Sequence, residues 1–193
     1  MKNVQKIGLF GGSFDPVHMG HIGLAIGAKK ELKLDKVIFI PARIPPHKLS
    51  KRPAPAEIRL KMLRAALKNH NGFQVSRYEL DRRPPTYTYQ TLEHFSRLYP
   101  RSKLYFMIGM DSLLELKTWK RTENLFELAQ FAVTLRAGVK TPAKTPFRER
   151  ILMLKTRPAG LSSSVTTSPG GSQHETRLDR PDAADPRLSL PRR

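Results

Sequence analysis

Residues 7–21, IGLFGGSFDPVHMGH, decide the fold of this chain. They open with residues 7–10, the short apolar run of a covered parallel strand. Gly11 and Gly12 follow this run and carry no Cβ, so a bound group can approach the backbone closely. An Asp-Pro pair three residues later marks a bend. The stretch therefore predicts a buried strand, a glycine turn and the start of a helix.

Two histidines belong to the same stretch. His18 and His21 are three residues apart, so on the first turn of a helix they would share one face. The free N–H groups and the positive dipole end of that helix favour an anion at the same point. Imidazoles, glycine turn and helix start together predict a phosphate site that can also donate hydrogen bonds.

The rest of the chain alternates apolar runs with helical patterns. Later strands are expected at 36–41, 73–76, 104–109 and 131–135, and helices at 18–26, 55–69, 87–95, 111–116 and 125–129. In the helix after Pro55 the apolar positions, Ile58 among them, are interpreted as core. This alternation predicts an α/β fold with a doubly wound parallel sheet, whose ligands lie at the carboxyl ends of the strands. Gly11, Pro41 and Gly109 lie at or just past such ends, so the candidate groups should converge on one edge.

Composition narrows the class of protein. The chain has 193 residues, 39% of them hydrophobic and none of them cysteine, which predicts one domain with a sizeable core and excludes disulfides and thiolate metal sites. Neither a signal peptide nor a membrane-spanning apolar run is evident, so we expect a cytoplasmic protein with no membrane partner. The net charge of +19 can indicate nucleic-acid binding. Scattered basic residues without an aromatic RNA-binding signature favour a small polyanionic substrate instead.

Four motifs in order carry a resemblance to a known family. Residues 12–21, GSFDPVHMGH, resemble the signature of the HxGH nucleotidylyltransferase superfamily. Three later stretches resemble the bacterial nicotinate-nucleotide adenylyltransferases within it, a Rossmann-like family. They are PARIPPHK at 41–48, YTYQTL at 87–92, and IGMDSL at 108–113 with Trp119 beyond.

The resemblance implies a reaction in NAD biosynthesis. Members of that family join nicotinate mononucleotide to ATP, which gives deamido-NAD and pyrophosphate. Since the attacking group is already a phosphate, no side chain need form a covalent intermediate, and catalysis is positioning plus charge stabilisation at the α-phosphate. His18 and His21 are the expected catalytic residues, as hydrogen-bond partners of the phosphate oxygens. Lys48 joins them as a mobile positive charge.

The resemblance also implies a set of ATP contacts. These residues are Gly11, Gly12, Ser13, Phe14, Gly109, Asp111 and Arg136. Asp111 would accept hydrogen bonds from ribose hydroxyls, although its position before an apolar run also suits a plain helix N-cap. Mg²⁺ is expected with the triphosphate, held mainly by phosphate oxygens and water, with no residue assigned as a metal ligand.

Tyr87, Thr88 and Trp119 are the residues that the resemblance assigns to nicotinate mononucleotide. Trp119 would stack on the pyridinium ring, whose positive charge an indole face attracts. Thr88 could hold the ring carboxylate through its hydroxyl and its backbone N–H. Each residue has a structural alternative, because the single Trp of the chain can be a core anchor and Tyr87-Thr88 can be an ordinary helix start.

The family pattern stops midway near the C-terminus. The family has Ile-Ser-Ser-Thr/Ser-x-Ile-Arg opening a phosphate-binding helix, whereas residues 161–169 here are LSSSVTTSP. From Thr166 onward there is no Lys, Ile, Val, Phe, Tyr, Trp or Met, a composition typical of disorder. We therefore divide the chain into a nucleotidylyltransferase domain, 1–165, and a divergent tail, 166–193. Our hypothesis is that the tail is out of frame or otherwise replaced, which resequencing of the locus would test.

Other functions stay open at this stage. Pantetheine-phosphate adenylyltransferases share the first motif, so phosphopantetheine is an alternative substrate. The interrupted C-terminal block also leaves room for an inactive protein that binds nucleotides or nucleic acid. The sequence does not decide between a monomer and a homo-oligomer.

Overall fold

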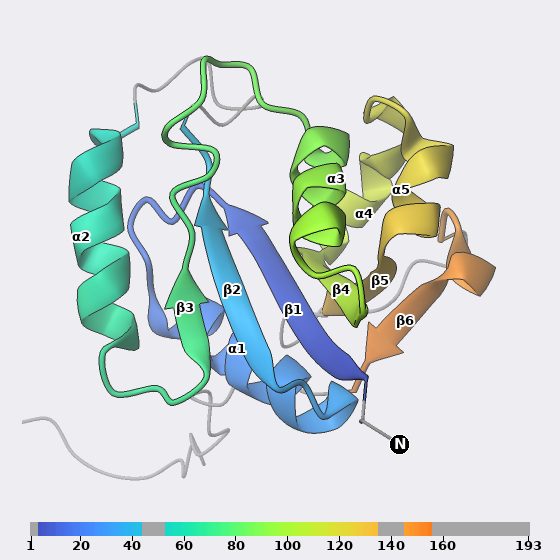
Figure 1. Ribbon diagram of the computed structural model, residues 1–193, viewed down its shortest axis with the longest axis horizontal. Helices are drawn as coiled ribbons and strands as arrows, with labels where there is room; N and C mark the ends of the chain where they lie inside the picture. Colours follow the sequence, from blue (N-terminus) through green and yellow to red (C-terminus); the bar gives the residue numbers. More distant parts are fainter. Residues whose placement is uncertain (1–3, 44–52, 135–144, 156–193) are drawn as a thin grey trace, which may run out of the picture. The chain divides into compact units, whose positions relative to one another are not determined.

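Six parallel strands form the centre of the part of the chain that the structure describes (Figure 1). The structure is a computed structural model, and it describes residues 4–43, 53–134 and 145–155. The strands are β1 (Gln5–Gly12), β2 (Lys36–Pro41), β3 (Phe73–Val75), β4 (Ser102–Gly109), β5 (Gln130–Thr134) and β6 (Ile151–Leu154). Their order across the sheet is β3-β2-β1-β4-β5-β6. This order confirms the predicted doubly wound, Rossmann-like sheet.

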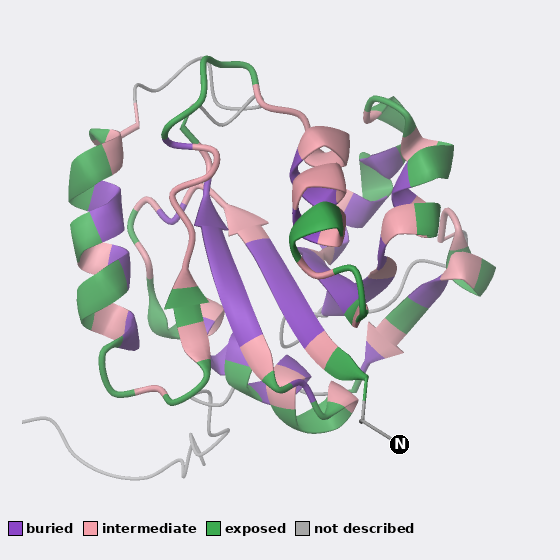
Figure 2. Cartoon of the chain, viewed as in Figure 1, coloured by how far each residue is buried: buried purple, intermediate pink, exposed green. Residues whose placement is uncertain are grey.

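Helices cover both faces of the sheet (Figures 1 and 2). The helices on one face are α1 (Met19–Leu32) and α2 (Ala56–Leu67). Those on the other are α3 (Thr88–Leu98), α4 (Met110–Leu114) and α5 (Thr122–Leu128), with the 3-10 helix η1 (Leu116–Thr118). A second 3-10 helix, η2 (Arg148–Arg150), leads into β6. Because both faces are covered, the middle of each central strand is buried, as Figure 2 shows for β1 and β2.

The order in which strands are added to the sheet changes direction between β1 and β4. After β3 the chain returns to the centre, and β4 pairs with β1 on the side away from β2. In open α/β sheets, ligands bind beyond the carboxyl ends of the strands at such a switch point. Gly12 ends β1 and Gly109 ends β4, so the two glycines mark this position.

Close packing behind β1 depends on Gly8. A Cβ at this residue would lie 2.7 Å from Cδ1 of Leu34 and 3.3 Å from Cγ2 of Val37. Both neighbours are buried, and Leu34 lies in the corner where α1 turns into β2. The missing side chain therefore lets α1 and β2 approach the central strand.

The sixth strand was not among the five that the sequence predicts. It has four residues between charged neighbours, and an apolar run of that length does not distinguish a strand from a helix by periodicity. Pairing decides it, because Ile151 lies opposite Phe131 in parallel register with β5. The backbone N–H of Lys155 then donates to the Glu31 carboxylate at 3.0 Å, which joins the end of β6 to α1.

The core side of α2 also differs from the prediction. Ile58, interpreted from the sequence as a core residue, is 50% exposed. Its neighbour Arg59 is fully buried instead, together with Leu60 and Leu63. The apolar stripe identified the helix correctly but misplaced its edge, because a charged residue occupies one of the inward positions.

Several predictions lie outside the described residues. Lys48, Arg136 and the block at 161–165 fall there, as does the whole tail, 166–193. The division of the chain at residue 165 therefore stays a prediction. Within the described ranges, no helix is long and apolar enough to cross a membrane.

The packing around Gly8 leads to a stability prediction. Gly8→Ala is expected to lower the free energy of unfolding by about 1–3 kcal/mol, because the new methyl group overpacks the corner at Leu34. Gly109→Ala is the matched control, since a Cβ there meets no atom within 4 Å. Urea unfolding of both variants checks this, and equal stability of the two would contradict the packing argument.

Candidate active site

The two histidines of the first motif lie together at the carboxyl end of β1. His18 is the N-cap residue of α1, with an extended backbone, and His21 lies on the first turn of the helix. Their ring centroids are 3.8 Å apart, with 31° between the ring planes. The predicted shared face is therefore present, and both rings stand at the start of the first crossover.

A hydrogen bond fixes the orientation of His21. The backbone N–H of His18 donates to Nδ1 of His21 at 3.2 Å. Nδ1 is thus an acceptor, so in the neutral imidazole the proton belongs on Nε2, which becomes the donor. Phe14 packs edge-on against the same ring, with centroids 5.2 Å apart. His21 is consequently a half-buried, oriented donor, whereas His18 is exposed.

Gly20 explains why a glycine separates the histidines in this motif. A Cβ at Gly20 would lie 2.9 Å from both Cε1 and Nδ1 of His18. Any larger residue would therefore push the His18 ring out of its position beside His21. The glycine is needed for the placement of the imidazole rather than for backbone freedom.

The turn between β1 and α1 contains a strained residue. Phe14 has a φ of 46°, in the left-handed region that side chains other than glycine avoid, yet its ring is fully buried. The ring packs against Phe10 and Phe39 with centroids 5.4 and 5.7 Å away, and it lies beneath Gly12. Phe14 can therefore face a ligand only through its backbone, together with Ser13 and the two glycines.

The second side of the site begins where β4 ends. Gly109 is the N-cap of α4, with open space where a Cβ would stand, and Asp111 is the second residue of the helix. The suggestion that Asp111 serves as the N-cap is thus wrong, because the N-cap is Gly109 and the helix begins two residues earlier than an N-cap at Asp111 would place it. Its side chain is exposed on the first turn, at the same sheet edge as the histidines.

A layer of aromatic rings and cations surrounds the start of α3. Tyr87 is the N-cap residue, and its backbone N–H donates to Oε1 of Gln90 at 3.0 Å. Nζ of Lys120 lies 4.2 Å from the Tyr87 ring centroid, and the guanidinium of Arg121 lies 4.5 Å from that of Tyr89. Hydrogen bonding to Tyr87 raises the pKa of Lys120. This contact joins the start of α3 to the segment that follows Trp119.

Trp119 packs partly against the core, which is the structural alternative considered for it in the sequence analysis. Its ring packs edge-on against Phe106, with centroids 6.4 Å apart, and it borders the core beneath α3 and α5. Its Nε1 atom is buried without a hydrogen-bond partner among the described residues, as is Oγ1 of Thr86. Two buried polar atoms thus remain unsatisfied near the start of α3, and Thr88 is the first residue of that helix.

Two ionisable groups, one partly and one fully buried, were not identified from the sequence. Glu79 accepts a hydrogen bond from Oγ1 of Thr91 at 2.7 Å, and burial raises its pKa to about 7. Arg59 is fully buried, and burial lowers its pKa while the charge of Asp15 opposes that effect. No motif contains Arg59. The one feature of the sequence that could have identified it is its position between two apolar residues in a predicted helix.

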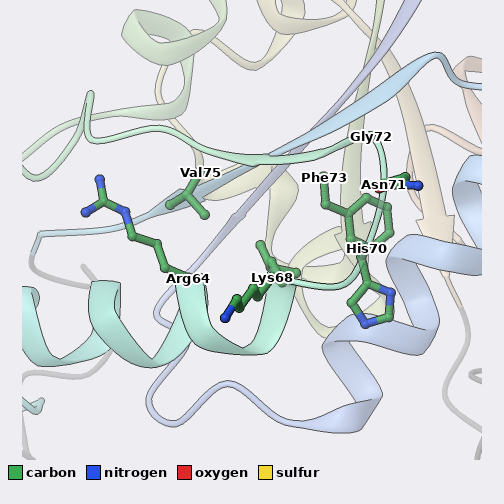
Figure 3. Close-up of a pocket in the computed structure, with 8 residues that line it drawn as sticks. Arg64, Lys68, His70, Asn71, Gly72, Phe73 and Val75 are labelled. Atoms are coloured by element: carbon green, nitrogen blue, oxygen red, sulfur yellow. The ribbon is translucent and has the colours of Figure 1, made fainter.

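A pocket lined by described residues lies away from the two histidines (Figure 3). Its volume is about 420 Å³, and it lies between the C-terminal end of α2 and the start of β3. Arg64, Lys68 and His70 are among its lining residues. Because Gly72 and Phe73 lead into the amino end of β3, this pocket is not at the edge that holds the histidines. No three His, Asp or Glu side chains of the described ranges gather closely enough to hold a metal ion.

The geometry agrees with comparisons to known proteins. A model of the cytidylyltransferase-like family matches residues 9–166. The chain is 43% identical over 168 residues to a probable nicotinate-nucleotide adenylyltransferase of Carboxydothermus hydrogenoformans, covering 83% of each chain. It is 44% identical over 134 residues to one from Exiguobacterium sibiricum, covering 69% of this chain and 70% of the relative.

Solved structures support the fold. The Plasmodium falciparum nicotinic acid mononucleotide adenylyltransferase, complexed with NaAD, is similar with a TM-score of 0.64 and 21% identity, over 82% of this chain and 77% of that one. A putative nicotinate-nucleotide adenylyltransferase from Vibrio parahaemolyticus has a TM-score of 0.53 and 25% identity, over 67% of this chain and 73% of that one.

The partly buried carboxyl group of Glu79 predicts a pH-dependent stability. Between about pH 4.5 and pH 7 the folded protein keeps this proton and the unfolded chain releases it, so stability should fall as the pH rises through that window. In the wild type this fall should lower the free energy of unfolding by about 1–3 kcal/mol. Glu79→Gln has no carboxyl group to ionise at this position, so it should lack that fall. Urea unfolding from pH 4 to 8 tests this, with exposed Glu127→Gln as the charge-matched control. Parallel curves for the wild type and Glu79→Gln would contradict it.

Proposed function

Because the chain belongs to the cytidylyltransferase-like family and, within it, to the nicotinate-nucleotide adenylyltransferases, we propose that it transfers the adenylyl group of ATP to nicotinate mononucleotide. The products are deamido-NAD and pyrophosphate. The observation that carries the proposal is the pair of imidazoles, 3.8 Å apart, at the start of α1 and at the switch point of the sheet. Such a pair can contact two oxygens of one phosphate group.

The chemistry needs no nucleophilic side chain. A phosphate oxygen of nicotinate mononucleotide forms the new bond to the α-phosphorus of ATP, and the bond from that phosphorus to the bridging oxygen of pyrophosphate breaks. The oriented Nε2–H of His21 donates to a phosphate oxygen, and His18 supports the charge that develops as pyrophosphate leaves. The amino end of α1 adds its dipole at the same place.

The two substrates are assigned to the two sides of the switch point. ATP contacts the backbone of the turn after β1 and the end of β4, where Gly109 leaves open space and Asp111 is the proposed acceptor for the ribose hydroxyls. Nicotinate mononucleotide lies toward the start of α3, beside Tyr87, Thr88 and Trp119. The unsatisfied Nε1 of Trp119 supports a polar ligand group there.

The metal ion arrives with the nucleotide in this proposal. The described residues offer no cluster of three acidic or histidine ligands, and Mg²⁺ prefers phosphate oxygens and water over such a cage. The chemistry that Mg²⁺ supplies is neutralisation of charge on the triphosphate. Lys48 and Arg136 lie outside the described residues. Lys48 remains a predicted catalytic cation for the phosphates, and Arg136 remains a predicted ATP contact.

The proposed activity leads to a direct assay. The full chain, incubated with ATP and Mg²⁺, should release pyrophosphate with nicotinate mononucleotide and form deamido-NAD. Nicotinamide mononucleotide and phosphopantetheine are the parallel substrates, and chromatography of the products separates the three reactions. Turnover of phosphopantetheine in preference to both mononucleotides would overturn the assignment, as would ATP binding without turnover of any of them.

The paired imidazoles lead to a test by substitution. His18→Ala and His21→Ala are each expected to lower kcat by about 10²–10³, because each removes a donor to a developing charge. Gly20→Ala should lower kcat in the same direction without touching an imidazole, since its Cβ displaces the His18 ring. His70→Ala, at the amino end of β3, is the control histidine. Unchanged kcat in Gly20→Ala would contradict the role given to the ring position.

A further inference from the structure

Arg59 is a fully buried cation whose hydrogen bonds to the described residues all go to main-chain carbonyls. Nη1 donates to the oxygen of Ser13 at 2.6 Å, Nη2 to that of Arg43 at 3.0 Å, and Nε to that of Ala54 at 2.9 Å. One side chain from α2 therefore joins the turn after β1 to two positions beyond β2. The same region is joined a second time, because the N–H of Ala54 donates to the carboxylate of Asp15 at 3.0 Å.

The charge of Arg59 has no direct counterion in the part of the chain that the structure describes. Asp15 acts on it only through space, and the three acceptors are neutral carbonyls. A buried charge is tolerated when its hydrogen bonds are complete, and the fork of a guanidinium can serve three diverging acceptors where an ammonium cannot. The arrangement therefore fixes three backbone segments and leaves a positive charge beneath the turn that receives the phosphates.

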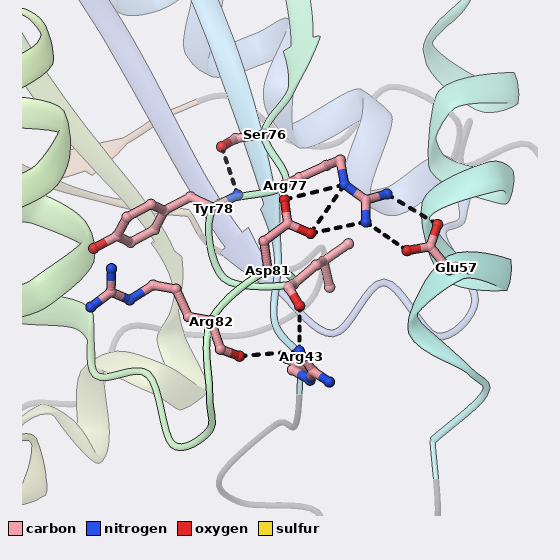
Figure 4. A network of polar contacts seen from close by, with 8 residues as sticks. Arg43, Glu57, Ser76, Arg77, Tyr78, Asp81 and Arg82 are labelled. Atoms are coloured by element: carbon pink, nitrogen blue, oxygen red, sulfur yellow. Dashed lines mark hydrogen bonds and ion pairs between the residues drawn. The ribbon is translucent and has the colours of Figure 1, made fainter.

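Arg43 extends the connection in the opposite direction (Figure 4). Its carbonyl accepts from Arg59, while its own Nη1 donates to the carbonyls of Leu80 at 2.8 Å and Arg82 at 3.2 Å. Residues 83–86 connect the accepting segment to Tyr87, the N-cap residue of α3. Two arginines thus connect the turn after β1 with the segment before α3 through carbonyl contacts alone.

The segment before α3 is fixed at a second point as well. Arg77 pairs with Glu57 of α2 at 2.7 Å and with Asp81 at 2.9 Å (Figure 4). These partners are more than half exposed, so the pairs add little stability by themselves. They keep the segment close to α2, the helix that carries Arg59.

We propose that Arg59 and Arg43 are a relay of positioning residues that sets the ATP-binding turn and the start of α3 at a fixed separation. The inference rests on the proposed function, because it assigns ATP to the turn and the pyridine nucleotide to α3. Neither arginine touches the reacting atoms. The relay acts by holding the two substrates in line for the transfer, where a misplacement near 1 Å is enough to cost about 10²-fold in rate.

Methionine variants test the relay, because each one removes a single positive charge and the hydrogen bonds of one arginine. Arg43→Met frees the segment before α3 and leaves the Ser13 contact in place, so KM for nicotinate mononucleotide should rise about tenfold while ATP affinity is unchanged. Arg59→Met should free both segments, so it should raise KM for nicotinate mononucleotide about tenfold as well as weaken ATP binding and lower kcat. Arg64→Met, an exposed arginine on the same helix, is the control and should change neither quantity.

The double variant decides whether the two arginines act as one unit. In a relay, Arg43→Met should add little to KM for nicotinate mononucleotide once Arg59→Met is present. The increase in this KM in the double variant should therefore be at least about fivefold smaller than the product of the two single increases. Multiplicative effects in the cycle would overturn the proposal. Arg59→Lys, which keeps the charge but not the three contacts, should behave like Arg59→Met, and full activity of this variant would also overturn it.

Hydrogen exchange separates failure of the relay from failure of the proposed function. In the full chain without substrates, Arg43→Met should speed exchange of amides at 80–90 while amides at 13–21 keep wild-type rates, and Arg59→Met should speed both groups. This readout needs no turnover and does not depend on which nucleotide the protein uses. If Arg59→Met does not fold, Arg43→Met still tests the outer half, and unchanged exchange at 80–90 in that variant would overturn the relay.

Discussion

The turn after β1 depends on the fully buried ring of Phe14. A left-handed backbone in a residue other than glycine costs about 1–3 kcal/mol, and burial of the ring against Phe10 and Phe39 offsets that cost. Since the two partner rings come from different strands, the turn is stable only when β1 and β2 are paired. The direction of α1, and with it the position of both imidazoles, follows from this packing.

The site is assembled from segments that lie far apart in the sequence. The imidazoles come from the first crossover, Asp111 from the helix after β4, and Tyr87 from the start of α3. Backbone carbonyls held by Arg59 and Arg43 fix the spacing of two of these segments. Main-chain acceptors suit this purpose, because their positions depend on the fold and do not change with side-chain rotamer.

Strongly patterned elements could be predicted from the sequence. The second strand was placed at residues 36–41, as observed, and the histidine pair at the start of a helix, because both patterns depend on neighbours in the chain. The errors arose where distant contacts decide. Ile58 is exposed because Arg59 occupies the inward position of the helix. Residues 151–154 form a strand because they pair with β5 at the edge of the sheet. The assignment of Asp111 as an N-cap failed by two residues at a helix boundary, where local preference is weak.

By itself the sequence determined the doubly wound class, the family and the glycine-histidine motif at the first crossover, since all three depend on patterns along the chain that need no knowledge of its contacts. Only the tertiary structure decided which nitrogen of His21 donates and how a buried arginine joins Ser13 to the end of β2. The reason is physical. A proton position and a buried charge depend on the groups that surround them, and those groups come from parts of the chain that meet only in the folded protein.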